Sequence, residues 1–243
     1  MSLTPEMIAS MLDHSTLQPF LTPADIEKGC EIALQYQTAS VCARPCDVPI
    51  LTKMLAGSPV KVCTVIGFPH GAHTSATKLF EAEEALKNGC QELDMVINIG
   101  QLLAGNTDYV EKEIAALARL CHKENALLKV ILENCYLTDE QKIKACKLSE
   151  AAGADFVKTS TGYGTSGAKI EDLVLMRKAV SPKVQVKASG GIRDLDTVLA
   201  ARAVGASRCG VSATVAIMEQ ALKRYALGTL VPAQALKEMG EGY

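Results

Sequence analysis

Two lysines at the ends of neighbouring predicted strands are the residues best suited to chemistry. Lys158 follows the apolar segment 155–157 and precedes a glycine-rich run, and Lys187 takes the matching place in VQVKASGG. A buried lysine is rare, because removing water from an ammonium group is costly and lowers its pKa. A neutral amine near pH 7 attacks carbonyl groups and forms a Schiff base, and a second cation beside it favours the neutral form. The pattern therefore indicates a lysine nucleophile.

A carboxylate on a third predicted strand extends this set. Asp94 lies among apolar residues in ELDMVIN. A lone buried carboxylate would be costly, but opposite Lys187 it would be a stabilised anion that can relay protons. Charged residues on three strands predict a functional site, because an apolar core has no structural reason to hold them. The alternative for Lys158 is a buried stem with an amine that reaches solvent.

Composition limits the classes of partner. The chain has 243 residues, 48% of them hydrophobic, and a formal net charge of −2. This charge argues against nucleic acid or an anionic membrane as the main partner. The N-terminus does not resemble a signal peptide, and no apolar run approaches the ~20 residues of a membrane span. Nine cysteines without the spacing of a disulfide framework are typical of a reducing compartment, so we expect a soluble, cytoplasmic protein.

Strand-like and helix-like patterns alternate along the whole chain. A short N-terminal helix at residues 5–11 precedes eight expected strands, each followed by a helix, at residues 12–17, 39–43, 60–68, 92–99, 127–133, 155–160, 184–189 and 206–212. We expect one long helix from the fourth strand to about residue 125 and a last helix at 232–239. Eight βα repeats in about 250 residues predict a single-domain (β/α)8 TIM barrel over residues 1–243.

A doubly wound open sheet is the competing α/β architecture. Gly162, Gly164 and Gly167 spell G-x-G-x-x-G between a strand and a helix. The dinucleotide-binding form of this motif also needs an acidic residue about 20 positions later, and Lys187 stands in that region. The motif therefore does not indicate a nucleotide cofactor, and the barrel is preferred.

Glycines after the last two predicted strands indicate a phosphate site. Gly190 and Gly191 follow Lys187, and Gly210 begins GVSA, which leads into the last helix of the barrel. Backbone amides at a helix N-terminus bind phosphate, and the loops after strands seven and eight are the usual phosphate site of this architecture. The alternative is that each glycine only makes a tight turn.

These motifs resemble the deoxyribose-phosphate aldolase family, which are class I aldolases on a (β/α)8 barrel. The segments that carry the resemblance are LDHSTLQP, VCARPCDVP, VIGFPHGAHTSATKLFEA, ELDMVINIG, LKVILE, VKTSTGYGTSGAK, VKASGGIR and RCGVSA. The resemblance implies reversible cleavage of 2-deoxy-D-ribose 5-phosphate to acetaldehyde and D-glyceraldehyde 3-phosphate, without metal or cofactor. It also implies that Lys158 forms the Schiff base, Lys187 perturbs it electrostatically and Asp94 helps to move protons.

The resemblance implies further site residues. Phosphate would be held by the loops after the last two strands, and the whole expected substrate-binding set is Asp13, Cys42, Thr161, Gly162, Gly190, Gly191, Gly210 and Ser212. Asp13 and His14 would bind substrate hydroxyls or satisfy backbone amides. The family includes members whose C-terminal tyrosine assists proton transfer, so Tyr243 is expected to be catalytic, on a tail that its glycines make mobile. A homo-oligomer, dimer or tetramer, is also expected.

The sequence departs from the family pattern at several positions. Gln18 replaces a usual lysine, and GFPHGAH places His70 and His73 near the barrel mouth. No third ligand follows these histidines at metal spacing, so we expect no zinc site. GVSAT contains Val211 in place of a hydroxyl residue, and Thr214 in place of glycine adds bulk near the expected phosphate.

Two functions other than an aldolase stay open at this point. In a non-catalytic sugar-phosphate binder, Lys158 would only pair with the charge of the ligand. In a phosphosugar isomerase, Asp94 would be the base, and activity would survive loss of Lys158.

Overall fold

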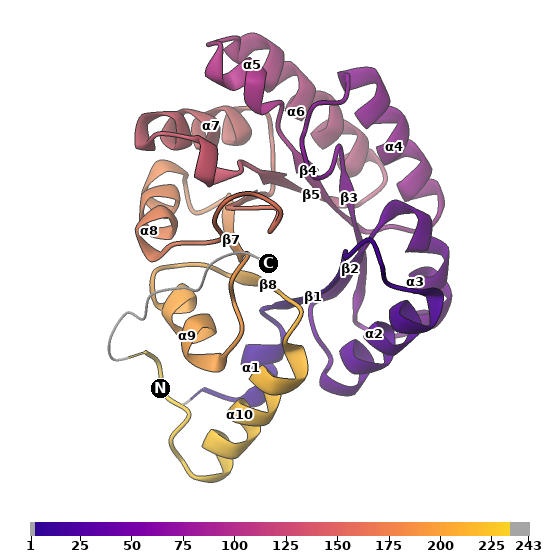
Figure 1. Cartoon of the computed structure of the whole chain (residues 1–243), viewed down its shortest axis with the longest axis vertical. Helices are drawn as coiled ribbons and strands as arrows, with labels where there is room; N and C mark the ends of the chain where they lie inside the picture. The colour runs from indigo at the N-terminus through magenta and orange to yellow at the C-terminus, as the bar shows by residue number, and fades with distance from the viewer. Residues whose placement is uncertain (1–2, 234–243) are drawn as a thin grey trace.

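Eight parallel strands close into a barrel in the computed structural model, which describes residues 3–233 (Figure 1). Each strand pairs with its neighbours along the chain, and the last strand pairs with the first. The strands are β1 (Leu12–Thr16), β2 (Ser40–Ala43), β3 (Lys61–Ile66), β4 (Glu92–Val96), β5 (Leu127–Ile131), β6 (Phe156–Lys158), β7 (Gln185–Ser189) and β8 (Arg208–Val211). This architecture confirms the predicted (β/α)8 barrel.

Helices surround the barrel as an outer layer (Figure 1). They are α1 (Pro5–Ala9), α2 (Pro23–Tyr36), α3 (Val48–Met54), α4 (Ser75–Lys87), α5 (Ile99–Leu103), α6 (Thr107–Lys123), α7 (Asp139–Ala151), α8 (Ile170–Ala179), α9 (Leu195–Ala203) and α10 (Thr214–Ala226). Two short 3₁₀ turns are η1 (Pro45–Asp47) and η2 (Asn134–Tyr136). Within residues 3–233, no helix has the length and apolar character needed to span a membrane.

Side-chain caps fix where several helices begin. Thr22 accepts a hydrogen bond from the backbone N–H of Asp25, whose carboxylate accepts from the backbone N–H of Thr22. Thr138 and Gln141 form the same reciprocal capping box at the start of α7. Each box satisfies amides that have no partner within the helix. The predicted starts of these two helices are therefore confirmed.

The helical segments differ from expectation in two places. The long helix expected after β4 is instead two helices, α5 and α6, because Gly105 between them has a left-handed backbone, with φ of +80°. The N-terminal helix ends at Ala9, two residues before the expected end. Of the helix expected at residues 232–239, Pro232 and Ala233 are not helical, and the remainder lies outside the described residues.

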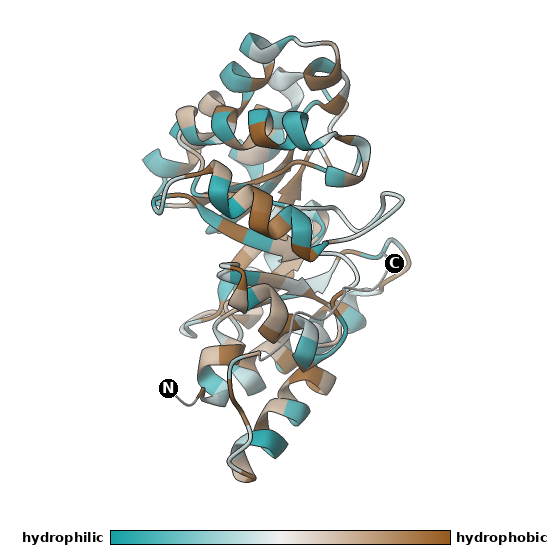
Figure 2. Cartoon of the chain, turned by 90° about the vertical axis from the view of Figure 1, so that its left-hand side faces the viewer, coloured by the Kyte–Doolittle hydropathy of each residue, from teal (hydrophilic) through white to brown (hydrophobic). Residues whose placement is uncertain are grey.

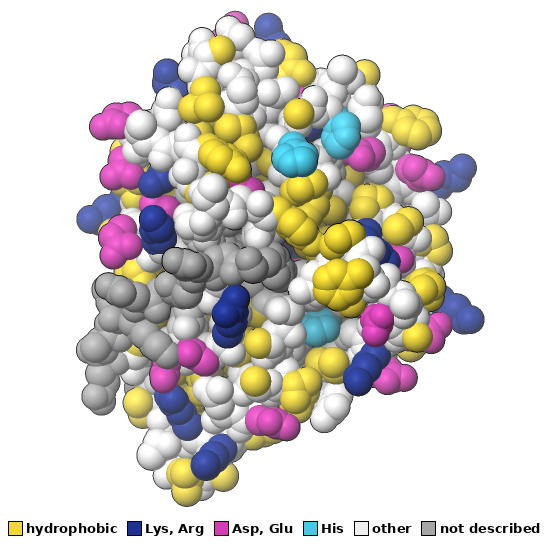
Figure 3. Space-filling model, in the orientation of Figure 1, with side chains coloured by type: hydrophobic (Ala, Val, Ile, Leu, Met, Phe, Trp, Pro, Cys, Tyr) yellow, Lys and Arg dark blue, Asp and Glu magenta, His cyan; other side chains and the backbone are white. Residues whose placement is uncertain are grey.

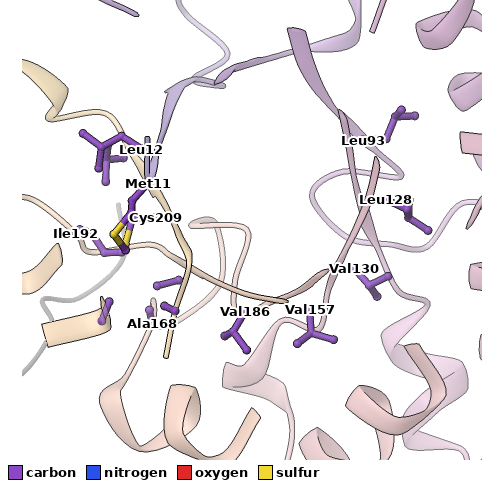
Figure 4. Close-up of a cluster of buried hydrophobic side chains, with 14 of the residues drawn as sticks. Met11, Leu12, Leu93, Leu128, Val130, Val157, Ala168, Val186, Ile192 and Cys209 are labelled. Carbon is purple, nitrogen blue, oxygen red and sulfur yellow. The ribbon is translucent and has the colours of Figure 1, made fainter. Parts of the chain in front are cut away.

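The main hydrophobic core lies between the barrel and the helices. Alternate residues of a strand point to opposite faces, and Figure 4 shows Leu128, Val130, Val157 and Val186 directed away from the barrel axis. The helices mix hydrophobic and hydrophilic residues along their length, as Figure 2 shows, so that apolar side chains cover the strands. With the outer face of the strands packed in this way, the intervening residues face the inside of the barrel.

Candidate active site

Asp94, Lys158 and Lys187 meet inside the barrel. Lys158 and Lys187 are register partners on β6 and β7. Their Nζ atoms donate to the same carboxylate oxygen, Oδ2 of Asp94, at 2.7 Å and 2.8 Å. Lys158 is only 2% exposed, so the interpretation in which its amine reaches solvent is wrong. The structure thus brings together the three charged residues that the sequence singled out.

The charged cluster is larger than the sequence indicated. Lys129 of β5 donates to Oδ1 of Asp94 at 2.9 Å and forms an ion pair with Glu92 at 2.6 Å. Arg208 of β8 links Glu92 at 2.5 Å to Asp13 at 2.8 Å. Our reading of the sequence missed Lys129, Glu92 and Arg208. Each is a charged residue in a short apolar strand, at a position that alternates with the outward-facing residues. A charge at such an inward-facing position is the sequence signal that would have identified them.

Asp13 and His14 of β1 point to opposite faces of the barrel wall. Asp13 is the second residue of β1, and its carboxylate forms ion pairs with Lys187 at 2.5 Å and with Arg208 at 2.8 Å. His14 points to the other face, where its Nδ1 lies 2.8 Å from the hydroxyl of Thr214. The expectation that His14 binds substrate is therefore wrong, because strand alternation turns it away from the barrel interior.

Mutual charge fixes the protonation of the cluster. Burial alone would raise the pKa of Asp94, but the ammonium groups of Lys129, Lys158 and Lys187 hold it well below its usual range. Burial alone would lower the pKa of Lys187, but the carboxylates of Asp13 and Asp94 raise it. Asp94 is thus an anion and Lys187 a cation at neutral pH.

A small pocket lies beside these groups. It is lined by Asp13, Ser15, Leu17, Cys42, Lys158, Thr161, Lys187, Ser189 and Gly210. A Cβ atom at Gly210 would lie 2.8 Å from Oγ of Ser189 and 3.4 Å from Cε of Lys187, so a glycine leaves room for the lysine side chain. Cys42, Thr161 and Gly210, three residues of the expected substrate-binding set, therefore line one pocket with the two lysines.

The glycines expected at the phosphate site lie in adjoining loops. Gly162, Gly190 and Gly191 all have left-handed backbones, with φ of +90°, +86° and +78°. A Cβ atom at Gly167 would lie 2.4 Å from the carbonyl oxygen of Gly190, so the loops after β6 and β7 pack backbone to backbone. This close approach accounts for a glycine at position 167, the last of the G-x-G-x-x-G motif, without a nucleotide.

The remaining residues of the motif GVSAT, at positions 211–214, do not all lie on the same side of the barrel wall. Ser212 is exposed just before α10. Val211 and Thr214 are buried, and the hydroxyl of Thr214 is held by His14 on the outer side of β1. Thr214 therefore adds no bulk to the pocket, contrary to the expectation from the sequence. Tyr243 lies outside the described residues.

Glu133 is a further buried acid that our sequence analysis did not identify. It follows β5 with a left-handed backbone, with φ of +56°. Its carboxylate accepts hydrogen bonds from the backbone N–H and the hydroxyl of Thr161, and burial raises its pKa. Glu133 therefore fixes the start of the loop after β6, where the pocket wall turns toward solvent.

The face onto which Figure 1 looks carries a group of hydrophobic side chains. Figure 3 shows hydrophobic side chains gathered to the right of the centre, near histidines, and most charged side chains toward the periphery. A second, wider pocket on the described surface is lined by Pro69, His70, Ile99, Leu103, Glu133, Tyr136, Thr161, Tyr163 and Gly164. Thr161 lines both pockets, so the wider pocket adjoins the pocket that contains the lysines.

Comparison with known proteins identifies an aldolase family along most of the chain. Residues 7–219 match the DeoC/LacD family aldolase. The chain is 51% identical over 217 residues to the deoxyribose-phosphate aldolase of Rhodopirellula baltica, covering 89% of this chain and 90% of that protein. It is 52% identical over 222 residues to the deoxyribose-phosphate aldolase of Caldanaerobacter subterraneus, covering 91% of this chain and 96% of that protein.

A solved structure agrees with these relatives. The deoxyribose phosphate aldolase of Aeropyrum pernix, described as a tetramer, superposes with a TM-score of 0.83 at 32% identity, covering 94% of both chains. Fold, sequence and the buried lysine pair lead to the same conclusion. This chain belongs to the DeoC/LacD aldolase family.

Proposed function

We propose that this protein is a class I aldolase that reversibly cleaves 2-deoxy-D-ribose 5-phosphate to acetaldehyde and D-glyceraldehyde 3-phosphate. The observation that carries the proposal is the pair of buried lysines, Lys158 and Lys187, bonded to one oxygen of Asp94 beside a pocket. The relatives named deoxyribose-phosphate aldolase support the choice of substrate.

Lys158 is the lysine best placed to act as nucleophile. The ion-paired cluster holds four cations, Lys129, Lys158, Lys187 and Arg208, against three carboxylates, Asp13, Glu92 and Asp94. Loss of one proton would balance these charges, and an arginine does not lose it. Among the described residues, Lys158 has one carboxylate within ion-pair distance, whereas Lys187 has two and Lys129 has three. Lys158 is therefore the least paired of the three lysines, and we assign the role of nucleophile to it.

The chemistry follows from a neutral amine at Lys158. Its Nζ attacks the C1 aldehyde of the open-chain sugar, and loss of water gives a protonated imine. A base removes the proton of the C3 hydroxyl, the C2–C3 bond breaks, and the electron pair moves into the imine to form an enamine. D-glyceraldehyde 3-phosphate leaves, the enamine takes a proton at C2, and water releases acetaldehyde from Lys158. Asp94 and Lys187 lie close enough to Nζ of Lys158 to exchange protons with the imine nitrogen and with the substrate atoms bonded next to it.

Binding of the sugar phosphate would use the loops above the pocket. The proposal assigns phosphate to the backbone of Gly162, Gly190 and Gly191 and to the start of α10 with Ser212. Left-handed glycines allow close approach of backbone amides, and a helix N-terminus attracts an anion. Gly210 and Thr161 would shape the pocket below, next to Cys42.

The proposal also covers the role of Tyr243, the oligomeric state, the cellular location and the number of domains. Tyr243 would assist proton transfer, and its Tyr243→Phe variant would turn over more slowly while still forming the Schiff base. A dimer or tetramer is proposed because the Aeropyrum pernix relative is described as tetrameric. All nine cysteines are free thiols, which fits a cytoplasmic location. We propose one domain over the whole chain.

Turnover of 2-deoxy-D-ribose 5-phosphate by the purified protein tests the proposal. Acetaldehyde and D-glyceraldehyde 3-phosphate should appear in equal amounts, and Lys158→Arg should abolish their formation because a guanidinium does not form an imine. An isomerised sugar phosphate as product, or activity that survives in Lys158→Arg, would identify an isomerase. Binding without any product would identify a sugar-phosphate binder.

A further inference from the structure

Two thiols face each other on the inner wall of the barrel. Cys42 of β2 and Cys63 of β3 are buried register partners on neighbouring parallel strands. Their sulfur atoms and a carboxylate oxygen of Asp94 all lie within 4.8 Å of one another. Neighbouring strands are about 4.8 Å apart, which is inside the range of about 4.4 to 6.8 Å found between the Cα atoms of a disulfide. The backbone therefore needs little movement for these sulfurs to bond.

The surrounding charge decides between a metal and a covalent bond at this pair. Two thiols and a carboxylate are a possible donor set for a soft metal. However, Asp94 already binds the ammonium groups of three lysines, and their positive charge opposes a metal cation. Oxidation to a neutral disulfide meets no such repulsion.

We propose that Cys42 and Cys63 form a peroxide-sensitive dithiol, whose oxidation to a disulfide lowers the activity of the adjoining lysine site. The proposal concerns modification of the protein and does not depend on which aldehyde or sugar the lysine site binds. It also assigns different tasks to the two thiols.

Cys42 is the thiol that meets the oxidant. It lines the pocket beside Lys158, whereas Cys63 is not among the lining residues, so hydrogen peroxide in this pocket would meet Cys42 before Cys63. A hydrogen bond with Cys63 lowers the pKa of the Cys42 thiol, although burial and the charge of Asp94 oppose it. Lys187 and Lys158 lower this pKa further. The thiolate is the form that reacts with peroxide.

Cys63 is the resolving thiol. Burial raises its pKa, and its Sγ lies 3.4 Å from Oδ1 of Asp94 and 3.4 Å from Nζ of Lys129. It therefore stays protonated until a reactive sulfur forms next to it.

The chemical steps balance with one molecule of hydrogen peroxide. The Cys42 thiolate attacks one peroxide oxygen, an S–O bond forms and the O–O bond breaks. The departing hydroxide takes the proton that Cys42 released and leaves as water, with Cys42 oxidised to a sulfenic acid. The sulfur of Cys63 then attacks that of Cys42, the S–S bond forms and the S–O bond breaks. The second hydroxide takes the proton of Cys63 as water, and peroxide has accepted two electrons.

The disulfide would disturb the lysine site through Cys63. Bonding to Cys42 draws Sγ of Cys63 away from Asp94 and Lys129, which it contacts in the reduced protein. Displacement of a reacting group by about 1 Å costs up to about 10²-fold in rate. We therefore expect oxidation to lower turnover by about tenfold to a hundredfold.

Peroxide treatment of the whole protein, followed by mass spectrometry, tests the proposal. The oxidised protein should lose the mass of two hydrogen atoms, and trypsin should release a linked pair of peptides, residues 29–53 and 62–78. The link should be absent from Cys42→Ser, which assigns it within the first peptide. Dithiothreitol should remove the link and restore turnover.

The variants separate the two tasks. Each is compared with its own untreated turnover, and its thermal unfolding confirms that it is folded. Cys42→Ser should keep its turnover under peroxide. Cys63→Ala should lose turnover without recovery, because an unresolved sulfenic acid oxidises further to a form that dithiothreitol does not reduce.

Cys46→Ser, which changes an exposed cysteine, should respond as the unmodified protein does. The proposal is overturned if the linked peptides do not form. It is equally overturned if the link forms and turnover is unchanged, or if Cys42→Ser is as sensitive to peroxide as the unmodified protein.

Discussion

The two faces of the same eight strands have opposite chemistry. On the outer face, side chains such as Leu93, Val130 and Val186 pack against the helices. On the inner face, the cluster of lysines, Arg208 and carboxylates fills the space between β4 and β1. Barrel interiors are commonly filled by branched apolar side chains, so this interior departs from what stability alone requires.

The contrast shows how the fold tolerates a buried charged site. Each fully buried Leu or Val contributes about 1.5 to 3 kcal/mol, and the outer face holds many of them. Desolvation of buried ions costs several kcal/mol each, which close opposite charges offset only in part. The outer core therefore stabilises the barrel, and the inner face can hold buried charged groups, among them Lys158 with a single carboxylate partner.

Replacing Asp94 should have the largest effect, because three lysines on the inner face depend on its carboxylate. Asp94→Asn should destabilise the fold by about 3 to 5 kcal/mol, the usual cost of removing one partner from a buried ion pair. Turnover should fall by about 10²- to 10⁴-fold, the range for lost acid–base groups. Urea unfolding and steady-state kinetics measure both effects.

Asp139→Asn is the matched control, because Asp139 is exposed on α7 and pairs with Lys142 at the surface. It should change stability by less than about 1 kcal/mol. Equal destabilisation by the two variants would remove the distinction between the inner cluster and the surface.

Lys187→Leu should have the next largest effect. Both lysines donate a hydrogen bond to Oδ2 of Asp94. Without Lys187, this oxygen would accept from Lys158 alone, so the ammonium group of Lys158 would lose its proton less easily. Turnover should fall, and the pH–rate profile should move to higher pH. Lys123→Leu, at an exposed lysine of α6, should leave the profile in place. A profile that is unchanged in Lys187→Leu would contradict the idea that Lys187 tunes Lys158.

A charge placed in the loop after β7 should affect binding more than chemistry. Gly191→Glu should weaken 2-deoxy-D-ribose 5-phosphate by at least about tenfold, since like charges in contact cost several kcal/mol. Unphosphorylated deoxyribose should be affected much less. Gly191→Ala carries the strain of the left-handed backbone without the charge, and it should not discriminate between the two sugars. Equal losses for both sugars in Gly191→Glu would show that this loop does not bind phosphate.

The smallest effect on turnover is expected on the outer face, at His14. Burial lowers the pKa of His14 to about 4, whereas an unfolded histidine titrates near about 6.5. The unfolded state therefore takes up its proton first as pH falls, and the fold should lose about 3 kcal/mol between pH 6.5 and 4. Urea unfolding across this range should show a shallower pH dependence in His14→Asn.

His122→Asn, at a half-exposed histidine on α6, should keep the pH dependence of the unmodified protein. If His14→Asn and the unmodified protein lose stability in parallel, His14 is not the group that titrates.

Strand alternation decides how much of this site is predictable from the sequence. Lys158 and Lys187 stand out because glycine-rich loops follow them, and the structure places them as register partners. Lys129 and Arg208 are inward-facing by the same alternation, but no loop motif marks them, and their partners lie on strands distant in sequence. Such pairings depend on closure of the barrel, which only the register of all eight strands defines.

Local motifs predicted the elements better than their ends. The capping boxes of α2 and α7 were readable because both partners lie within four residues. The break between α5 and α6 depends on the backbone of one glycine, Gly105, whose left-handed conformation the residue type permits but does not require. The direction of Thr214 depends on a partner, His14, about two hundred residues away in sequence.

Reductive trapping measures the central claim directly. The protein is incubated with acetaldehyde, reduced with sodium borohydride and digested for mass spectrometry, with untreated protein as reference. The account predicts a stable ethyl group on Lys158, loss of turnover, and unmodified Lys129 and Lys187, because Lys158 is the proposed nucleophile. A label on Lys187 in place of Lys158, or full turnover after reduction, would contradict it.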